Sequence, residues 1–102
     1  MPELAPYHPS PVVLIVENDV LERLSKAAIL RRQGLQVFEA ADIKEAMAVL
    51  NKIAVDVLVS NVSLIDGTVL AQWVHKSQPT TQVVWTMPRP SGQNHMRTAV
   101  LH

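Results

Sequence analysis

The sequence predicts an α/β protein with a three-layer, doubly wound parallel sheet that carries helices on both faces. Three observations support this fold class. Four short runs rich in β-branched residues recur along the chain, helical apolar spacing separates them, and the connections are short. The predicted order is strand and helix in alternation, with right-handed crossovers between the parallel strands.

The chain of 102 residues is short enough for a single domain. Residues 1–11 contain four prolines and are expected to form a disordered or extended lead-in. The domain itself is expected over residues 12–87. Residues 88–102 are expected to be an irregular tail, in which the letters TAVLH could form a short edge strand.

The amino-acid sequence directly predicts the first strand and the first helix. Val12–Val16 is a continuous apolar run, typical of a strand buried on both faces of a parallel sheet. Asn18 or Asp19 can cap a helix over about residues 20–33, which Gly34 ends. The apolar positions with helical spacing in this helix are Leu21, Leu24 and Ala28.

The second strand is LQVFEA, and Asp42 with Glu45 resembles a capping box at the start of the next helix. The apolar face of that helix is predicted to comprise Ile43, Ala46, Met47, Leu50 and Ile53. The third strand is Asp56–Ser60, and an Asp66-Gly67 turn is expected after it.

A helix from about Thr68 to Lys76 is expected next, and Pro79 marks the turn before the fourth strand, QVVWTM. The residues that this helix is predicted to bury are Val69, Leu70, Trp73 and Val74, so that Trp73 belongs to the core. His75 is expected on the solvent side.

Composition excludes several functions. Basic and acidic residues number nine each and no basic block occurs, which argues against nucleic-acid binding. No run approaches the roughly 20 apolar residues of a membrane span. The absence of cysteine excludes disulfides and thiolate metal sites and fits a cytoplasmic protein. The histidines, which are His8, His75, His95 and His102, lack metal-ligand spacing.

Polar side chains are expected to converge where the parallel strands end, because ligand sites in such sheets lie beyond the carboxyl ends of the strands. The residues at these strand ends are Glu17, Asn18, Asp19, Asn61 and Thr86.

Several segments in order resemble the receiver domain of response regulators. VVLIVENDVLERL is similar to the family's first strand and acidic turn, and VFEAADIKEAMAVL to its second strand and helix. DVLVSNVSLIDG resembles its third strand and phosphorylation loop, and VVWTM its fourth strand with a hydroxyl residue. The resemblance covers about residues 12–87 and implies a flavodoxin-like strand order of 2-1-3-4, with the fifth strand missing or vestigial.

The resemblance also implies what the site should contain. In the family a carboxylate at the end of the third strand accepts a phosphoryl group, two acids after the first strand help to hold Mg²⁺, and a lysine ends the fifth strand. Here Glu17 matches the first acid and Thr86 the hydroxyl residue, whereas Asn18 and Asn61 occupy the second acid and acceptor positions. No lysine follows Lys76, and Ile65 stands at the position of the loop proline.

These departures weaken the expected chemistry. Mg²⁺ prefers carboxylate, phosphate and water oxygens, and an amide supplies oxygen without charge. An amide is also a poor nucleophile, so Asn61 is not expected to form an acyl phosphate. Mg²⁺ binding is therefore expected to be weak or absent, and we expect no enzymatic activity and no cofactor. The simpler reading of Asn61 is a strand-end residue that satisfies nearby backbone groups; the functional reading is an amide that locks one conformation.

The same residues have simpler roles. Asn18 and Asp19 serve equally well as helix caps, and Thr86 serves equally well as an ordinary strand residue. If no fifth strand follows, Val83, Val84 and Trp85 lie on a sheet edge that needs a cover. The tail, a second copy or another protein would provide it, and of these we expect a homodimer.

Three functional readings follow. The first is a pseudo-receiver that binds protein partners, a sensor kinase or another regulator, without phosphorylation. The second is a working phosphoacceptor in which Glu17 and Asp19 hold the metal and another acid, such as Asp66, takes the phosphoryl group. The third is a decayed fragment without activity, suggested by the abrupt change in composition after Met87, where prolines, a glycine and polar residues follow.

Overall fold

The computed structural model describes residues 10–87 and 97–101. The predictions of a disordered start over residues 1–9 and of an irregular tail over residues 88–96 and 102 lie outside the described residues. The elements are β1 (Val12–Glu17), α1 (Val20–Arg32), β2 (Gln36–Ala40), α2 (Ile43–Leu50), β3 (Val57–Asn61), α3 (Leu64–Ser77), β4 (Gln82–Met87) and β5 (Arg97–Leu101).

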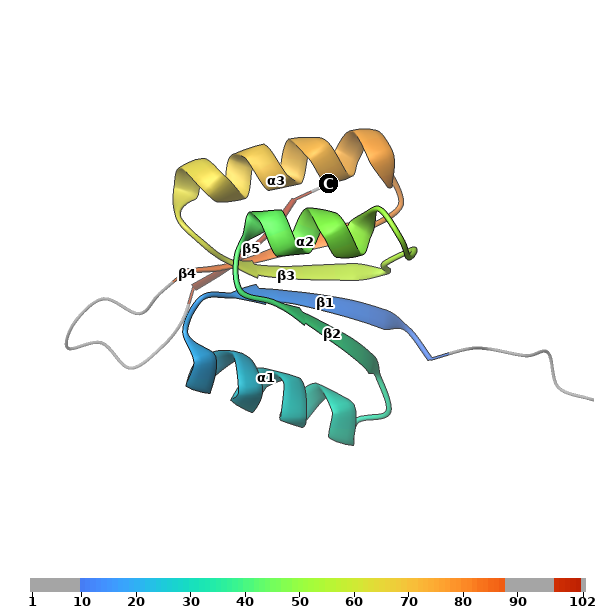
Figure 1. Cartoon of the computed structure of the whole chain (residues 1–102), viewed down its shortest axis with the longest axis vertical. Helices are drawn as coiled ribbons and strands as arrows, with labels where there is room; N and C mark the ends of the chain where they lie inside the picture. The colour runs from blue at the N-terminus through green and yellow to red at the C-terminus, as the bar shows by residue number, and fades with distance from the viewer. Residues whose placement is uncertain (1–9, 88–96, 102) are drawn as a thin grey trace, which may run out of the picture.

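A single five-stranded sheet has the order β2-β1-β3-β4-β5 (Figure 1). The pairs β1–β2, β1–β3 and β3–β4 are all parallel, which confirms the predicted order 2-1-3-4. In the part of the chain that the structure describes, no helix is long and apolar enough to cross a membrane.

The strand β5 pairs antiparallel with β4, from Val83 opposite Leu101 to Met87 opposite Arg97. The edge of β4 is therefore covered by the C-terminal segment of the same chain, which is one of the three possibilities considered from the sequence. The homodimer was expected from a bare β4 edge, and this argument no longer applies because β5 runs along that edge.

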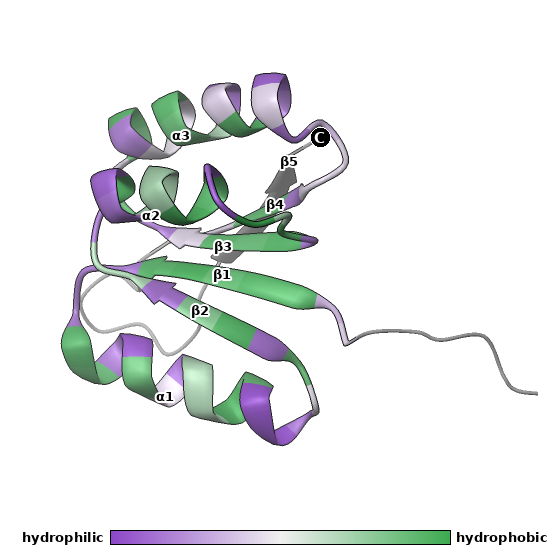
Figure 2. Cartoon of the chain, turned by 45° about the vertical axis from the view of Figure 1, so that its right-hand side comes forward, coloured by the Kyte–Doolittle hydropathy of each residue, from purple (hydrophilic) through white to green (hydrophobic). Residues whose placement is uncertain are grey.

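Helices cover both faces of the sheet, α1 on one side and α2 with α3 on the other (Figure 1). The core under α2 and α3 contains Leu14 and Leu58, both with 0% exposure, and the core under α1 contains Ile15 and Ala27. Figure 2 shows the central strands mainly in the colour of hydrophobic residues, with hydrophilic segments concentrated on the helices. The apolar run of β1 is therefore buried on both faces of the sheet, as predicted from its sequence.

The rotation of α1 differs from the prediction. Its expected inward residues, Leu21, Leu24 and Ala28, are exposed, and Ala27 faces the sheet instead. Polar side chains explain this orientation, because Arg31 donates to the Val37 carbonyl at 2.8 Å and other cations of α1 bond to β1 and β2. The prediction of a helix was correct, but the prediction of which helix face packs against the sheet was wrong. The helix begins at Asp19 as a cap and ends before Gly34, which has a φ of +90°.

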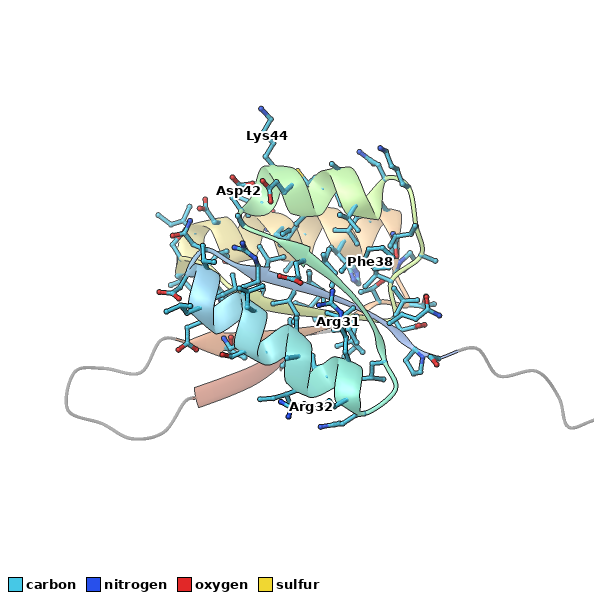
Figure 3. All side chains as sticks on the ribbon, turned by 60° about the horizontal axis from the view of Figure 1, so that its bottom comes forward. Arg31, Arg32, Phe38, Asp42 and Lys44 are labelled. Atoms are coloured by element: carbon cyan, nitrogen blue, oxygen red, sulfur yellow. The ribbon has the colours of Figure 1, made fainter. Side chains whose placement is uncertain are left out.

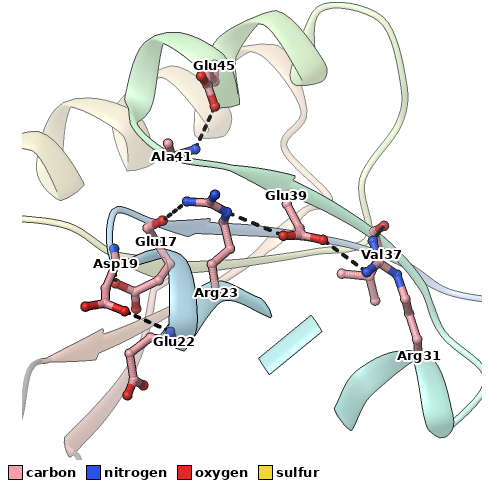
Figure 4. A network of polar contacts seen from close by, with 9 residues as sticks. All are labelled: Glu17, Asp19, Glu22, Arg23, Arg31, Val37, Glu39, Ala41 and Glu45. Carbon is pink, nitrogen blue, oxygen red and sulfur yellow. Dashed lines mark hydrogen bonds and ion pairs between the residues drawn. The ribbon is translucent and has the colours of Figure 1, made fainter. Parts of the chain in front are cut away.

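The start of α2 has the capping-box-like arrangement predicted for Asp42 and Glu45, with one difference in the second bond. Asp42 accepts a hydrogen bond from the Glu45 N–H at 2.9 Å, and the Glu45 carboxylate accepts one from the Ala41 N–H at 2.7 Å (Figure 4). The Asp42 side chain thus satisfies one of the free N–H groups at the helix start, while Glu45 binds the N–H of the residue before the cap rather than that of Asp42.

The start of α3 corrects a second prediction. The helix begins at Leu64 rather than near Thr68, because the Ser63 side chain caps it by accepting from the Asp66 N–H at 3.1 Å. Asp66 and Gly67 therefore lie in the first turn of the helix and do not form a separate turn. Leu70 and Val74 are buried and Trp73 packs partly against the core, but Val69 is exposed.

Candidate functional site

The parallel register of β1 and β3 places Glu17 directly beside Asn61. The Asn61 Nδ2 atom donates a hydrogen bond to Glu17 Oε1 at 2.5 Å. The Glu17 side chain is buried, with a residue exposure of 4%. Two of the residues that the sequence analysis placed at this end of the sheet therefore meet, and the amide bonds to a carboxylate rather than to the backbone.

Lys26 completes this contact from the middle of α1. Its Nζ atom lies 2.8 Å from the same Glu17 Oε1 atom. The other oxygen, Oε2, accepts a hydrogen bond from the Asp19 N–H at 3.1 Å. One carboxylate thus accepts three hydrogen bonds, one of them from a positively charged donor. We call Glu17, Lys26 and Asn61 the Glu17 cluster.

The backbone next to the Glu17 cluster is held by Arg23. Its guanidinium donates to the Glu17 carbonyl at 2.9 Å and lies 3.4 Å from a Glu39 carboxylate oxygen (Figure 4). Arg31 pairs with the other oxygen of Glu39 at 3.0 Å. These contacts tie α1 to the end of β1 and to β2.

The pKa of Glu17 reflects competing influences. Burial raises it, and this is the largest single contribution. Hydrogen bonds from Lys26, from Asn61 and from the Asp19 N–H, together with the positive charge of Lys26, outweigh burial and hold the pKa below the ordinary value of 4.5. The carboxylate is therefore ionised at neutral pH despite its burial.

This lowered pKa predicts an acid-dependent contribution to stability. A carboxyl whose pKa is lower in the folded state stabilises the fold fully above its unfolded pKa and loses that contribution as the pH falls through the folded pKa. We expect the difference in free energy of unfolding between the natural protein and Glu17→Gln to shrink as the pH falls below about 4.5, the ordinary value. Urea unfolding of both proteins at several pH values measures it. A difference that does not change with pH would contradict the prediction.

The remaining acidic-turn residues do not point to a metal site. Asp19 is the N-cap of α1, and its Oδ1 atom accepts from the Glu22 N–H at 2.9 Å (Figure 4). Asn18 is exposed. The capping reading therefore holds for Asp19, which is engaged at the start of the helix.

Thr86 lies in β4, one position beyond the last parallel pair with β3, which joins Ser60 to Trp85. Its hydroxyl donates to the Ser60 carbonyl in a long contact of 3.4 Å. This bond is compatible with an ordinary strand residue, and the match of Thr86 to the family's hydroxyl residue stays a prediction.

The residues of the predicted interface on β4 are largely enclosed within the chain, and their role as an interface stays a prediction. Val83 and Trp85 are buried under α3, and the Trp85 ring packs directly against Gly67. Val84 is half-buried and pairs in register with Val59, which belongs to the core under α1.

The residues present do not fit Mg²⁺. Both oxygens of Glu17 are already hydrogen-bonded, and Asn61 turns its amide nitrogen, not its oxygen, toward them. Within residues 10–87 and 97–101, no group of three or more His, Cys, Asp or Glu side chains could hold a metal ion. His75 is exposed on α3, as expected.

The sequence analysis did not identify Lys26 as part of this site. Nine positions separate it from Glu17, and only the observed rotation of α1 brings its side chain to the strand end. One signal in the sequence could have indicated it. The helix has leucines at helical spacing and also carries Arg23, Lys26 and Arg31 at helical spacing.

Comparisons with known proteins agree with this geometry. The family described as response regulator receiver domain matches residues 13–99. The receiver domain of the hybrid histidine kinase CckA has 34% sequence identity and a TM-score of 0.65, with 71% of this chain and 70% of that chain covered. The chemotaxis response regulator CheY4 of Vibrio cholerae has 27% identity and a TM-score of 0.67 over 72% of this chain.

The chain spans 65% of the length of CheY4. The receiver domain of an HD domain-containing protein from Pseudomonas fluorescens Pf-5 has 21% identity and a TM-score of 0.75, covering 87% of this chain and 67% of that chain, which shows the shared fold. The comparison with curated proteins returned no match. The family match covers most of the chain and the strand order is the one it implies, so the chain belongs to the response regulator receiver domain family.

Proposed function

We propose that this receiver domain is a cytoplasmic, non-enzymatic module of two-component signalling that acts by binding proteins and is not phosphorylated. The observation that carries the proposal is the Glu17 cluster. The position of the phosphoacceptor holds an amide, and that amide is bonded to the carboxylate that would otherwise serve a metal ion. An amide oxygen has neither the charge nor the nucleophilicity to take a phosphoryl group.

Exposed apolar residues near the same edge of the sheet support a protein partner. Leu21 on α1 and Ile65 on α3 are both 76% exposed, and Leu64 is 69% exposed. Both helices begin after neighbouring strands, β1 and β3, so these residues lie at the edge that carries the Glu17 cluster. Large apolar side chains exposed at the same end of the sheet favour association with a protein. A sensor kinase or another regulator is the partner that fits the family.

The alternative of a working phosphoacceptor receives no such support. Asp66 is exposed in the first turn of α3, where its N–H is bonded to the Ser63 cap. Asp19, the other acid in that reading, is bonded to the start of α1.

Treatment with acetyl phosphate and Mg²⁺, followed by intact mass measurement, tests the proposal. We expect no phosphate adduct on the natural protein under conditions in which a receiver domain with an aspartate acceptor is modified. The matched control is the variant Asp66→Asn, which removes the alternative acceptor. An adduct that is present on the natural protein and absent from Asp66→Asn would replace our proposal with the phosphoacceptor reading.

A further inference from the structure

We propose that the Lys26 ammonium is a permanent internal cation that takes the place of the divalent cation in this pocket. The inference rests on the proposed function and deepens it. We expect the Glu17 cluster not to bind metal ions even when a carboxylate is restored at position 61, because the Lys26 ammonium already pairs with Glu17. The replacement of Asn61 alone would then not recreate a metal site.

The position of Lys26 is the first argument. Its Nζ atom is 2.8 Å from Glu17 Oε1, and the two side chains are only 21% and 5% exposed. An ion pair this enclosed is screened less by solvent and salt than a pair on the surface. The ammonium therefore stands directly at the carboxylate that a metal ion would have to approach.

The rotation of α1 is the second argument. The helix exposes Leu21 and Leu24 while it turns Lys26 toward the end of β1. Burial of apolar area alone would favour the opposite face. The observed orientation of α1 therefore gives up hydrophobic burial and gains polar contacts of Lys26 and its neighbouring arginines with β1 and β2. This is expected if the internal cation is a specific feature of the fold.

The orientation of Asn61 is the third argument. Its Nδ2 atom faces Glu17 Oε1, and its Oδ1 atom is buried without a hydrogen-bond partner among the described residues. Rotation of the amide by half a turn would bring an oxygen against the Glu17 carboxylate oxygen. The ammonium and the amide together fill the acceptor sites of Glu17 that face them, and no oxygen of Asn61 is directed toward a cation.

Magnesium titration calorimetry on two variants tests the inference. Asn61→Asp restores the acidic acceptor with Lys26 in place, and the double variant Asn61→Asp with Lys26→Met also removes the internal cation. We expect the double variant to bind Mg²⁺ at least about tenfold more tightly than Asn61→Asp, because two carboxylates then face the ion without a competing positive charge. Circular dichroism and melting curves confirm that each variant is folded.

The matched control is Asn61→Asp with Lys44→Met. Lys44 is exposed and points away from the body of the protein in the first turn of α2 (Figure 3), so its removal changes net charge equally without touching the Glu17 cluster. We expect this control to bind Mg²⁺ like Asn61→Asp. Asn61→Asp with Lys26→Gln, which keeps a polar side chain, should reproduce the gain if the methionine variant does not fold.

The inference is overturned if Asn61→Asp binds Mg²⁺ as tightly as the Lys26 variants, or if the Lys44 control gains as much. It is equally overturned if the folded Lys26 variants bind no Mg²⁺, since Lys26 would then not be what excludes the ion. These outcomes are separate from the proposed function, which is decided by the mass of the natural protein after treatment with acetyl phosphate.

Discussion

Replacement of Leu14 by alanine should lower the free energy of unfolding by about 3–5 kcal/mol, as for fully buried leucines elsewhere. Leu14 lies in β1, between β2 and β3, and has 0% exposure. It belongs to the core under α2 and α3, together with Leu58 and Leu70. Truncation removes the transfer energy of the lost atoms and leaves a cavity among strands that are paired on both sides and cannot readily collapse.

The matched control is Leu21→Ala, the same change of side chain at a position that is 76% exposed. We expect a change in unfolding free energy within about 0.5 kcal/mol, since little apolar area is lost and alanine favours the helix. Urea denaturation of both variants, compared at equal slope, gives the two values. Similar destabilisation by the two substitutions would mean that α1 buries Leu21 in solution, which would contradict the observed rotation of the helix.

The first four strands were predictable because each is an apolar run bounded by turn or cap residues. Val12–Val16 and the third strand are apolar on both faces of the sheet, and a continuous run of this kind has few other structures available. The capping box at Asp42 is a local motif whose partner is three residues away, so it was read without knowledge of tertiary contacts.

The rotation of α1 was not predictable from apolar spacing. Leu21, Leu24 and Ala28 form as regular a pattern as the face that is actually buried. The choice between the two faces depends on partners far away in the sequence, notably Glu39 in β2, which binds Arg31 at 3.0 Å. The start of α3 was missed for a related reason, because the Asp66-Gly67 pair signals a turn only when no cap precedes it.

The candidate site was predictable in part. Glu17 and Asn61 were placed together because carboxyl ends of neighbouring parallel strands share one edge of a sheet. Lys26 was not, since its reach to Glu17 depends on the rotation of the helix. The buried position of Trp85 was also missed, because it depends on the close approach of α3 at Gly67, and the sequence placed the start of that helix too late.

Replacement of Gly67 by valine should lower the free energy of unfolding by about 3 kcal/mol, near the upper end for overpacked sites. A Cβ atom at Gly67 would lie 2.5 Å from Trp85 Cζ2 and 2.7 Å from Trp85 Cε2, closer than non-bonded carbons approach. The ring cannot move aside freely because Trp85 is buried under α3, on a strand that is paired with β3 on one side and β5 on the other. Glycine thus allows the first turn of α3 to approach the Trp85 ring closely.

A double-variant cycle with Trp85→Leu identifies the clash as the cause. Leucine lacks the ring atoms that the new side chain would meet, so Gly67→Val should cost less than half as much in the Trp85→Leu background as in the natural protein. Gln72→Val, at an exposed position of α3, reports the effect of valine on the helix itself and should cost about 0.5 kcal/mol. Equal costs of Gly67→Val in the two backgrounds would show that the ring is not the obstacle. Trp85 would then be able to move away from α3, so its buried position would not be fixed by the contact with Gly67.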